Sequence, residues 1–257
     1  LAGRFDGRAP RFSLLLHWRY YLDPPEYFTV LAGDVDGLHW GYYLDDPAHA
    51  SGCIASYFAS DAFELSADGD TLFEAVRLHL EMLARDYEEY RDEDPDNAAD
   101  YQEDLRQLDA FRVLLQGHTG ADRLETGDEY YVKYAGRVAR KRHVAAATHE
   151  GMGIVVHPEL YRSLSLPDKK LWSALRQKKD ASNLIEKARQ ALREGFPGTA
   201  LKLGKDLWAV GGERHTEYAY ELLDAAYAAL GRDVLRDVLR VHRENRDLPS
   251  VDILENE

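Results

Sequence analysis

The first part of the chain is dense in aromatic and β-branched residues and is interrupted by short turn signals. Three such signals lie between residues 12 and 63: Asp23-Pro24-Pro25, Asp36-Gly37 and Asp45-Asp46-Pro47. The pair Asp36-Gly37 supplies the positive φ values that a tight hairpin requires. The pattern predicts a meander with strands near 12–21, 27–33, 38–44 and 52–58.

A helical period follows Asp70. Thr71 and Glu74 are typical of a capping box at the start of a helix. Apolar residues then recur at steps of three and four along one stripe: Phe73, Val76, Leu80, Leu83, Tyr87 and Tyr90. A second stripe ends at Gln116-Gly117 and consists of Tyr101, Leu105, Leu108, Phe111 and Leu115. We interpret the ten acidic side chains between 85 and 104 as a solvated helix face and loop.

The second half of the chain is mainly helical in its pattern. Residues 129–157 are expected to be extended, and Lys205 to Val210 are expected to form a short strand or connector. The helices are predicted near 168–178, 182–194, 216–230 and 232–245. The predicted fold class is α+β, with an amino-terminal antiparallel strand-rich half that also holds helices and a mainly helical carboxy-terminal half. The predicted domains are 1–120 and 121–257, with a boundary near 117–130.

Composition and charge exclude several classes of protein. Lys and Arg total 32 against 46 Asp and Glu, so the net charge is −14 and direct binding to nucleic acid is not expected. No apolar stretch has the length of a membrane-spanning helix, and the amino terminus lacks the apolar core of a signal peptide. We therefore expect an intracellular protein with no membrane contact. The basic run from Lys133 to Arg142 either offsets nearby carboxylates or docks an anionic partner, and a solvated face is favoured.

Residues that often carry chemistry give no site by themselves. Cys53 has no partner for an internal disulfide and is interpreted as a buried structural thiol. His143, His149 and His157 fit no usual spacing of metal ligands, so no metal is predicted. The common phosphate-loop, hydrolase and zinc-protease signatures are absent from the sequence. Composition and periodicity therefore stop at an α+β protein without an assigned function.

Longer motifs carry a family resemblance over nearly the whole chain. The first stretch runs from Leu16 to Glu26 as LHWRYYLDPPE and is followed by Gly33-Asp34 and by GYYLDDP at 41–47. The carboxy-terminal half adds GMGIVV at 151–156, Tyr161-Arg162, LGKDLW at 203–208, Leu222-Leu223 and Ala226-Tyr227. These stretches resemble the histone PARylation factor family.

The resemblance implies an accessory factor rather than a stand-alone enzyme. Members of that family dock on the catalytic domain of a poly(ADP-ribose) polymerase, complete its active site and direct ADP-ribose transfer to serine. The polymerase binds the NAD, so no cofactor of the chain's own is expected, and histones or other serine-containing proteins are the acceptors. The resemblance also implies a place in the DNA damage response, in the nucleus of a eukaryote or the cytoplasm of a bacterium.

The same resemblance selects the candidate site. Counting back without gaps from Leu203 places Glu194 at the family's catalytic glutamate. Tyr161 and Arg162 match the family's Tyr-Arg pair near the composite site, and Arg193 replaces a family aspartate at a partner-binding position. Asp206 is interpreted as structural.

Two other functions stay open. The same fold can serve as an adaptor or immunity-type module that binds without contributing chemistry. An independent hydrolase that uses Glu194 or Asp206 is the least favoured, because no second acid lies at a distance that a motif defines.

Overall fold

The computed structural model describes residues 13–33, 36–47, 51–59, 64–118, 124–126, 132–134, 143–177, 179–210 and 212–245. Contacts group the chain into two compact units. The first unit comprises residues 1–52, 56–66 and 143–257, and the second comprises 53–55 and 67–142. Compactness is a different property from independent folding. The domains 1–120 and 121–257 therefore stay a prediction, and much of their boundary lies outside the described residues.

The amino-terminal sheet confirms three of the predicted strands. It has four strands in the order β1 (Tyr27–Ala32), β2 (Leu38–Asp46), β3 (Ser51–Phe58) and β4 (Ser66–Gly69). Strands β1 and β2 are antiparallel, with Tyr27 opposite Tyr43. Asp36 and Gly37 both have positive φ, 49° and 67°, as the hairpin turn requires. Strand β4 was not predicted because its sequence, SADG, lacks the β-branched and aromatic residues typical of strands.

The predicted strand near 12–21 is wrong for the residues described there. Leu14–Leu16 form the short 3-10 helix η1, and no strand follows between Leu16 and Tyr27. The reason lies in Arg19, whose buried guanidinium donates hydrogen bonds to the carbonyls of Leu15, Pro24 and Tyr27 at 3.2, 3.0 and 2.6 Å. Of these acceptors only the Leu15 carbonyl belongs to the predicted strand, and a side chain binds it in place of a neighbouring strand.

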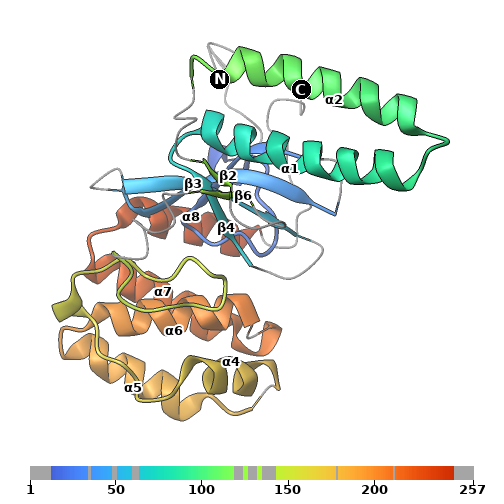
Figure 1. Ribbon diagram of the computed structural model, residues 1–257. Helices are drawn as coiled ribbons and strands as arrows, with labels where there is room; N and C mark the ends of the chain where they lie inside the picture. The colour runs from blue at the N-terminus through green and yellow to red at the C-terminus, as the bar shows by residue number, and fades with distance from the viewer. Residues whose placement is uncertain are drawn as a thin grey trace. The chain divides into compact units, whose positions relative to one another are not determined.

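The second unit holds a pair of long helices and a small sheet. Helices α1 (Leu72–Glu93) and α2 (Ala98–Leu115) lie side by side, and β5 (Leu124–Thr126) pairs antiparallel with β6 (Val132–Tyr134) (Figure 1). The predicted capping box is confirmed, since Glu74 N–H donates to Thr71 Oγ1 at 3.3 Å and Thr71 N–H donates to Glu74 Oε2 at 3.0 Å. The basic run up to Arg142 lies almost wholly outside the described residues, so its interpretations stay predictions.

The helices of the first unit confirm the helical carboxy-terminal half. They are α4 (Asp168–Arg176), α5 (Ser182–Arg193), α6 (Pro197–Val210), α7 (Thr216–Ala229) and α8 (Asp233–Glu244), with 3-10 helices η4 (Pro158–Leu160) and η5 (Glu213–His215). Helix α6 packs against both α5 and α7 (Figure 1). The α+β fold class is therefore confirmed.

One local prediction in this half is wrong, and another is confirmed only in part. Residues 205–210 form the end of α6 rather than a strand or connector. Every residue from Pro197 to Trp208 is buried, so α6 has no solvent-exposed face there, although Ala200, Leu203 and Leu207 recur at the helical steps of three and four. The expected extended segment 129–157 contains β6 at Val132–Tyr134, while between residues 143 and 157 the only β-structure is the isolated bridge of Ala146 with Ile154.

Candidate functional site

Glu194 stands at the turn between two helices. It is the C-cap residue of α5, and Gly195 follows with a φ of +91°. Gly195 N–H donates to the Leu192 carbonyl at 3.1 Å, and Phe196 N–H donates to the Ala191 carbonyl at 2.9 Å. This pair of bonds is a Schellman motif, which ends a helix at a defined residue. The backbone of Glu194 is therefore fixed, while its side chain stays 39% exposed.

The loop that carries Arg162 packs on the first turn of α6. Thr199 Oγ1 accepts a hydrogen bond from Arg162 N–H at 3.0 Å and donates one to the Arg162 carbonyl at 2.6 Å. At Gly198 an added Cβ would lie 2.9 Å from the Leu160 carbonyl oxygen, so only glycine permits this close approach. The backbone of Arg162 is thereby held near the end of α5.

Arg162 and Glu194 form an ion pair between these two segments. Arg162 Nη1 donates to Glu194 Oε2, and the guanidinium carbon lies 3.8 Å from the centre of the Phe196 ring. The aromatic face attracts the cation and limits its movement. Of the described residues, none accepts a hydrogen bond from Nε or Nη2 of Arg162, whose side chain is 52% exposed. One edge of the guanidinium therefore remains open for another acceptor.

The second oxygen of Glu194 has a different partner. Gln190 Nε2 donates to Oε1 at 2.8 Å from one helical turn earlier. The hydrogen bond from Gln190 and the one from Arg162 both favour the ionised carboxylate and hold the pKa of Glu194 below its usual range. Glu194 is thus an exposed, ionised proton acceptor with a fixed orientation.

The structure brings together two of the four predicted site residues through a direct contact. Arg162 binds Glu194, and Tyr161 lies half-buried beside Arg162 in the same loop. Arg193 points elsewhere, because its Nη2 donates to Glu186 Oε1 at 3.0 Å on the exposed surface of α5. The catalytic and partner-binding roles of these residues stay predictions.

Sequence reasoning missed three residues that shape the site. They are Gln190, Phe196 and Thr199. Only Gln190 had a usable signal, because a residue four positions before a helical glutamate faces it on the helix surface. The contact of Thr199 with Arg162 joins residues 37 positions apart, a separation that no local pattern reveals.

Asp206 lies in a separate polar cluster that is closed to solvent. Its carboxylate accepts hydrogen bonds from Lys202 Nζ at 2.7 Å and from Trp172 Nε1 and His149 N–H at 2.9 Å each. Burial raises the pKa of Asp206 to about 6, while the charge of Lys202 opposes that rise. With a fully buried side chain, this aspartate ties α4 and a loop to α6 and offers no surface to a substrate.

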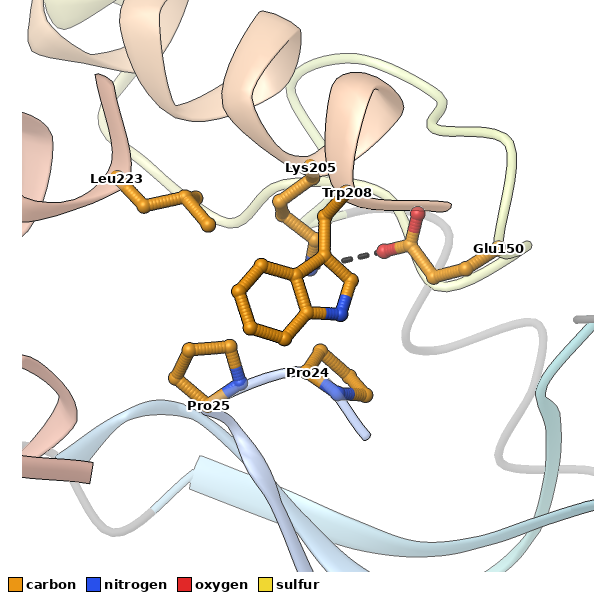
Figure 2. Close-up of a pocket in the computed structure, with 6 residues that line it drawn as sticks. All are labelled: Pro24, Pro25, Glu150, Lys205, Trp208 and Leu223. Carbon is orange, nitrogen blue, oxygen red and sulfur yellow. Dashed lines mark ion pairs between the residues drawn. The ribbon is translucent and has the colours of Figure 1, made fainter. Parts of the chain in front are cut away.

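Lys205, one residue before Asp206, anchors a second buried cluster. Its ammonium lies 2.9 Å from Glu150 Oε1 and 3.5 Å from Glu26 Oε1, and it also donates to the Tyr43 hydroxyl. Figure 2 shows the lysine and Glu150 beside Trp208, which stands over Pro24 and Pro25. These residues line a gap too narrow for a water molecule. The cluster therefore joins helix, loop and strand segments of the first unit rather than forming a binding site.

Among the residues that the structure describes, no group of three or more His, Cys, Asp or Glu side chains is placed to hold a metal ion. None of the helices described there combines the length and apolarity that crossing a membrane requires.

The whole sequence is similar to one family of proteins. A family model described as Histone PARylation factor 1 matches residues 1–246. Histone PARylation factor 1 of Danio rerio is 29% identical over 264 residues, which cover 95% of this chain and 70% of that protein. The Bos taurus protein of the same name is 28% identical over 274 residues, covering 99% and 75%. A Homo sapiens protein named Putative histone PARylation factor 1-like is 25% identical over 262 residues, covering 95% and 70%.

Proposed function

Because the chain belongs to the histone PARylation factor 1 family, we propose that it acts as an accessory factor of a poly(ADP-ribose) polymerase and lends Glu194 to the polymerase active site. The family supports the accessory role. The observation that supports the chemical role is an exposed carboxylate whose orientation is fixed by Arg162 and Gln190 and whose pKa is held low.

Transfer of ADP-ribose to serine needs a base of this kind. A serine hydroxyl is a weak nucleophile at neutral pH, and a carboxylate that accepts its proton makes attack on the ribose C1′ easier. The bond between C1′ and the nicotinamide nitrogen breaks as the new bond to serine oxygen forms, and nicotinamide leaves with the electron pair. The developing positive charge on the ribose is also stabilised by a nearby anion. The polymerase holds the NAD in this proposal, and the chain supplies the carboxylate.

Arg162 links docking to chemistry. Its Nη1 donates to Glu194, while its open edge, Nε and Nη2, can donate two parallel hydrogen bonds to a carboxylate of the polymerase. Tyr161 supports the loop beside it. Arg193 would contact an acidic residue of the polymerase only after it releases Glu186, to which it donates a hydrogen bond at 3.0 Å. Docking through Arg162 therefore brings the polymerase next to the base.

The test combines four components and one matched control. The full chain is mixed with the catalytic domain of a poly(ADP-ribose) polymerase, labelled NAD and a serine-containing histone peptide. The variant Glu194→Gln keeps the size of the side chain and removes its basicity. Glu213→Gln makes the same change at an exposed position on η5, away from the candidate site.

We expect label on serine with the wild type and with E213Q, and a loss of about 10²- to 10⁴-fold with E194Q, as for removal of a positioned base. Binding to the polymerase, measured by calorimetry, is expected to persist in E194Q. Equal serine transfer by E194Q and the wild type would refute the chemical role. Binding without any effect on transfer would favour the non-catalytic adaptor function instead.

A further inference from the structure

The two oxygens of Glu194 are held by donors of different character. Oε2 accepts a hydrogen bond from the charged guanidinium of Arg162, and Oε1 accepts one from the neutral amide of Gln190 at 2.8 Å. A charge-assisted hydrogen bond is roughly twice as strong as a neutral one. The two oxygens are therefore unequal in how readily they accept a further proton.

The Arg162 side is also the more rigid one. The guanidinium stacks 3.8 Å from the Phe196 ring centre, and the backbone of Arg162 is tied to Thr199 by two hydrogen bonds. Gln190 lies on the exposed surface of α5, and the hydrogen bond from its amide is the contact that it makes with the carboxylate of Glu194. Each carboxylate oxygen offers two acceptor directions, so Oε1 and Oε2 each keep one open, and the open direction on Oε1 belongs to the oxygen that is bound by the neutral, weaker donor.

We propose that Gln190 is a positioning residue that aims Oε1 of Glu194 at the acceptor serine, and that Oε1 receives the serine proton. This inference rests on the proposed function. In the step itself, the serine oxygen bonds to the ribose C1′, the bond from C1′ to the nicotinamide nitrogen breaks with its electron pair going to nicotinamide, and the proton moves from serine to Oε1. Arg162 stays on Oε2 throughout.

The hydrogen bond from Gln190 also sets the basicity of the carboxylate. It favours the charged form, so its removal raises the pKa of Glu194. The base acts in its ionised form, and the acidic limb of the pH profile of serine transfer therefore moves to higher pH when the amide is lost.

Three variants test the contact. Gln190→Met removes the donor with little change of shape or helix propensity. Gln190→Lys keeps a donor and adds a positive charge, so it lowers the pKa of Glu194 and moves the acidic limb the opposite way. Asn183→Met is the matched control, because it removes an exposed amide from the same helix near its other end.

The titration of Glu194 is first followed by carboxyl-carbon NMR on the full chain without the polymerase. The pH profile of serine transfer is then measured with the polymerase catalytic domain present. We expect Q190M to raise the pKa of Glu194 and to reduce turnover by about threefold to tenfold, as for one lost hydrogen bond, with polymerase affinity unchanged. N183M should match the wild type in both measurements.

Two failures can be told apart. If Q190M titrates and turns over like N183M, the positioning role is wrong even where transfer depends on Glu194. If serine transfer does not depend on Glu194 at all, both proposals fail. If the pKa of Glu194 is nevertheless higher in Q190M than in the wild type, the contact with Gln190 exists and the failure lies in the proposed function.

Discussion

Thr199 connects the stability of the fold to the geometry of the candidate site. Its hydroxyl makes both hydrogen bonds to the backbone of Arg162, at 3.0 and 2.6 Å, and the residue is only 1% exposed. The substitution Thr199→Val removes the hydroxyl while it keeps the branched shape, so no large cavity forms. We expect the loop around Arg162 to loosen while α6 stays intact.

The magnitude follows from the two lost bonds. Each typical hydrogen bond contributes about 1 kcal/mol to the free energy of unfolding, so T199V should destabilise the chain by about 2 kcal/mol. In a chain of this length that corresponds to a fall in Tm of about 4–8 °C. If the free energy of local opening of the loop falls by the same amount, hydrogen exchange of the Arg162 amide should accelerate by about thirtyfold, because about 1.4 kcal/mol corresponds to a factor of ten.

Thermal unfolding and amide exchange by NMR measure the two effects. Thr199→Ser is the control, since it keeps the hydroxyl and removes only a methyl group. T199S should therefore lose some stability and still protect the Arg162 amide. Two results would contradict this role of the Thr199 hydroxyl. One is an Arg162 amide that exchanges as slowly in T199V as in the wild type, and the other is an amide that exchanges as fast in T199S as in T199V.

Three further perturbations test the contacts of Arg162, Lys205 and Asp206. Arg162→Ala removes the open edge of the guanidinium, so it should weaken polymerase binding in calorimetry, and unchanged binding would contradict the docking role. The same variant removes the charged partner of Glu194 Oε2, so it should raise the pKa of Glu194 in an NMR titration. Lys205→Met should destabilise the chain by about 3–5 kcal/mol in urea unfolding, because two carboxylates lose their buried cation, and Glu150→Gln in the same chain should recover part of the loss. For Asp206 the pKa of about 6 in the folded chain lies above the value in the unfolded chain. Its contribution to the free energy of unfolding is therefore fully present below about pH 4 and is lost as the pH rises through 6, a fall of about 3 kcal/mol. Urea unfolding across pH 4–7 should show that decline in the wild type and a flatter profile in Asp206→Asn.

The sequence predicted best where local chemistry decides the structure. Asp36-Gly37 specifies a turn that few other pairs adopt, and Thr71 with Glu74 specifies the start of a helix, so both were found. Helix α6 is hard to predict because Gly198 and Gly204 weaken its helical signal, although its apolar residues keep a helical period. The segment around Arg19 has the apolar content of a strand, and that content does not reveal that its buried guanidinium binds the carbonyls of Leu15, Pro24 and Tyr27.

The candidate site was even less visible in local patterns. Glu194 before a glycine is typical of any helix end, and only the family resemblance selected it. Its contact with Arg162 joins residues 32 positions apart, and Phe196 and Thr199 complete the arrangement through packing between separate segments. Spacing rules describe neighbours within one element, so contacts between elements lie beyond them.

Only three residues separate α5 from α6, and this brevity affects how two proteins can build one catalytic centre. A reactive group on a long flexible segment would have to be immobilised when the two proteins bind, and the loss of conformational entropy would weaken the complex. A carboxylate at a capped helix corner has already lost most of that freedom during folding. Association of a chain built in this way can therefore be brief and weak and still deliver the group in a reactive geometry each time the partners meet.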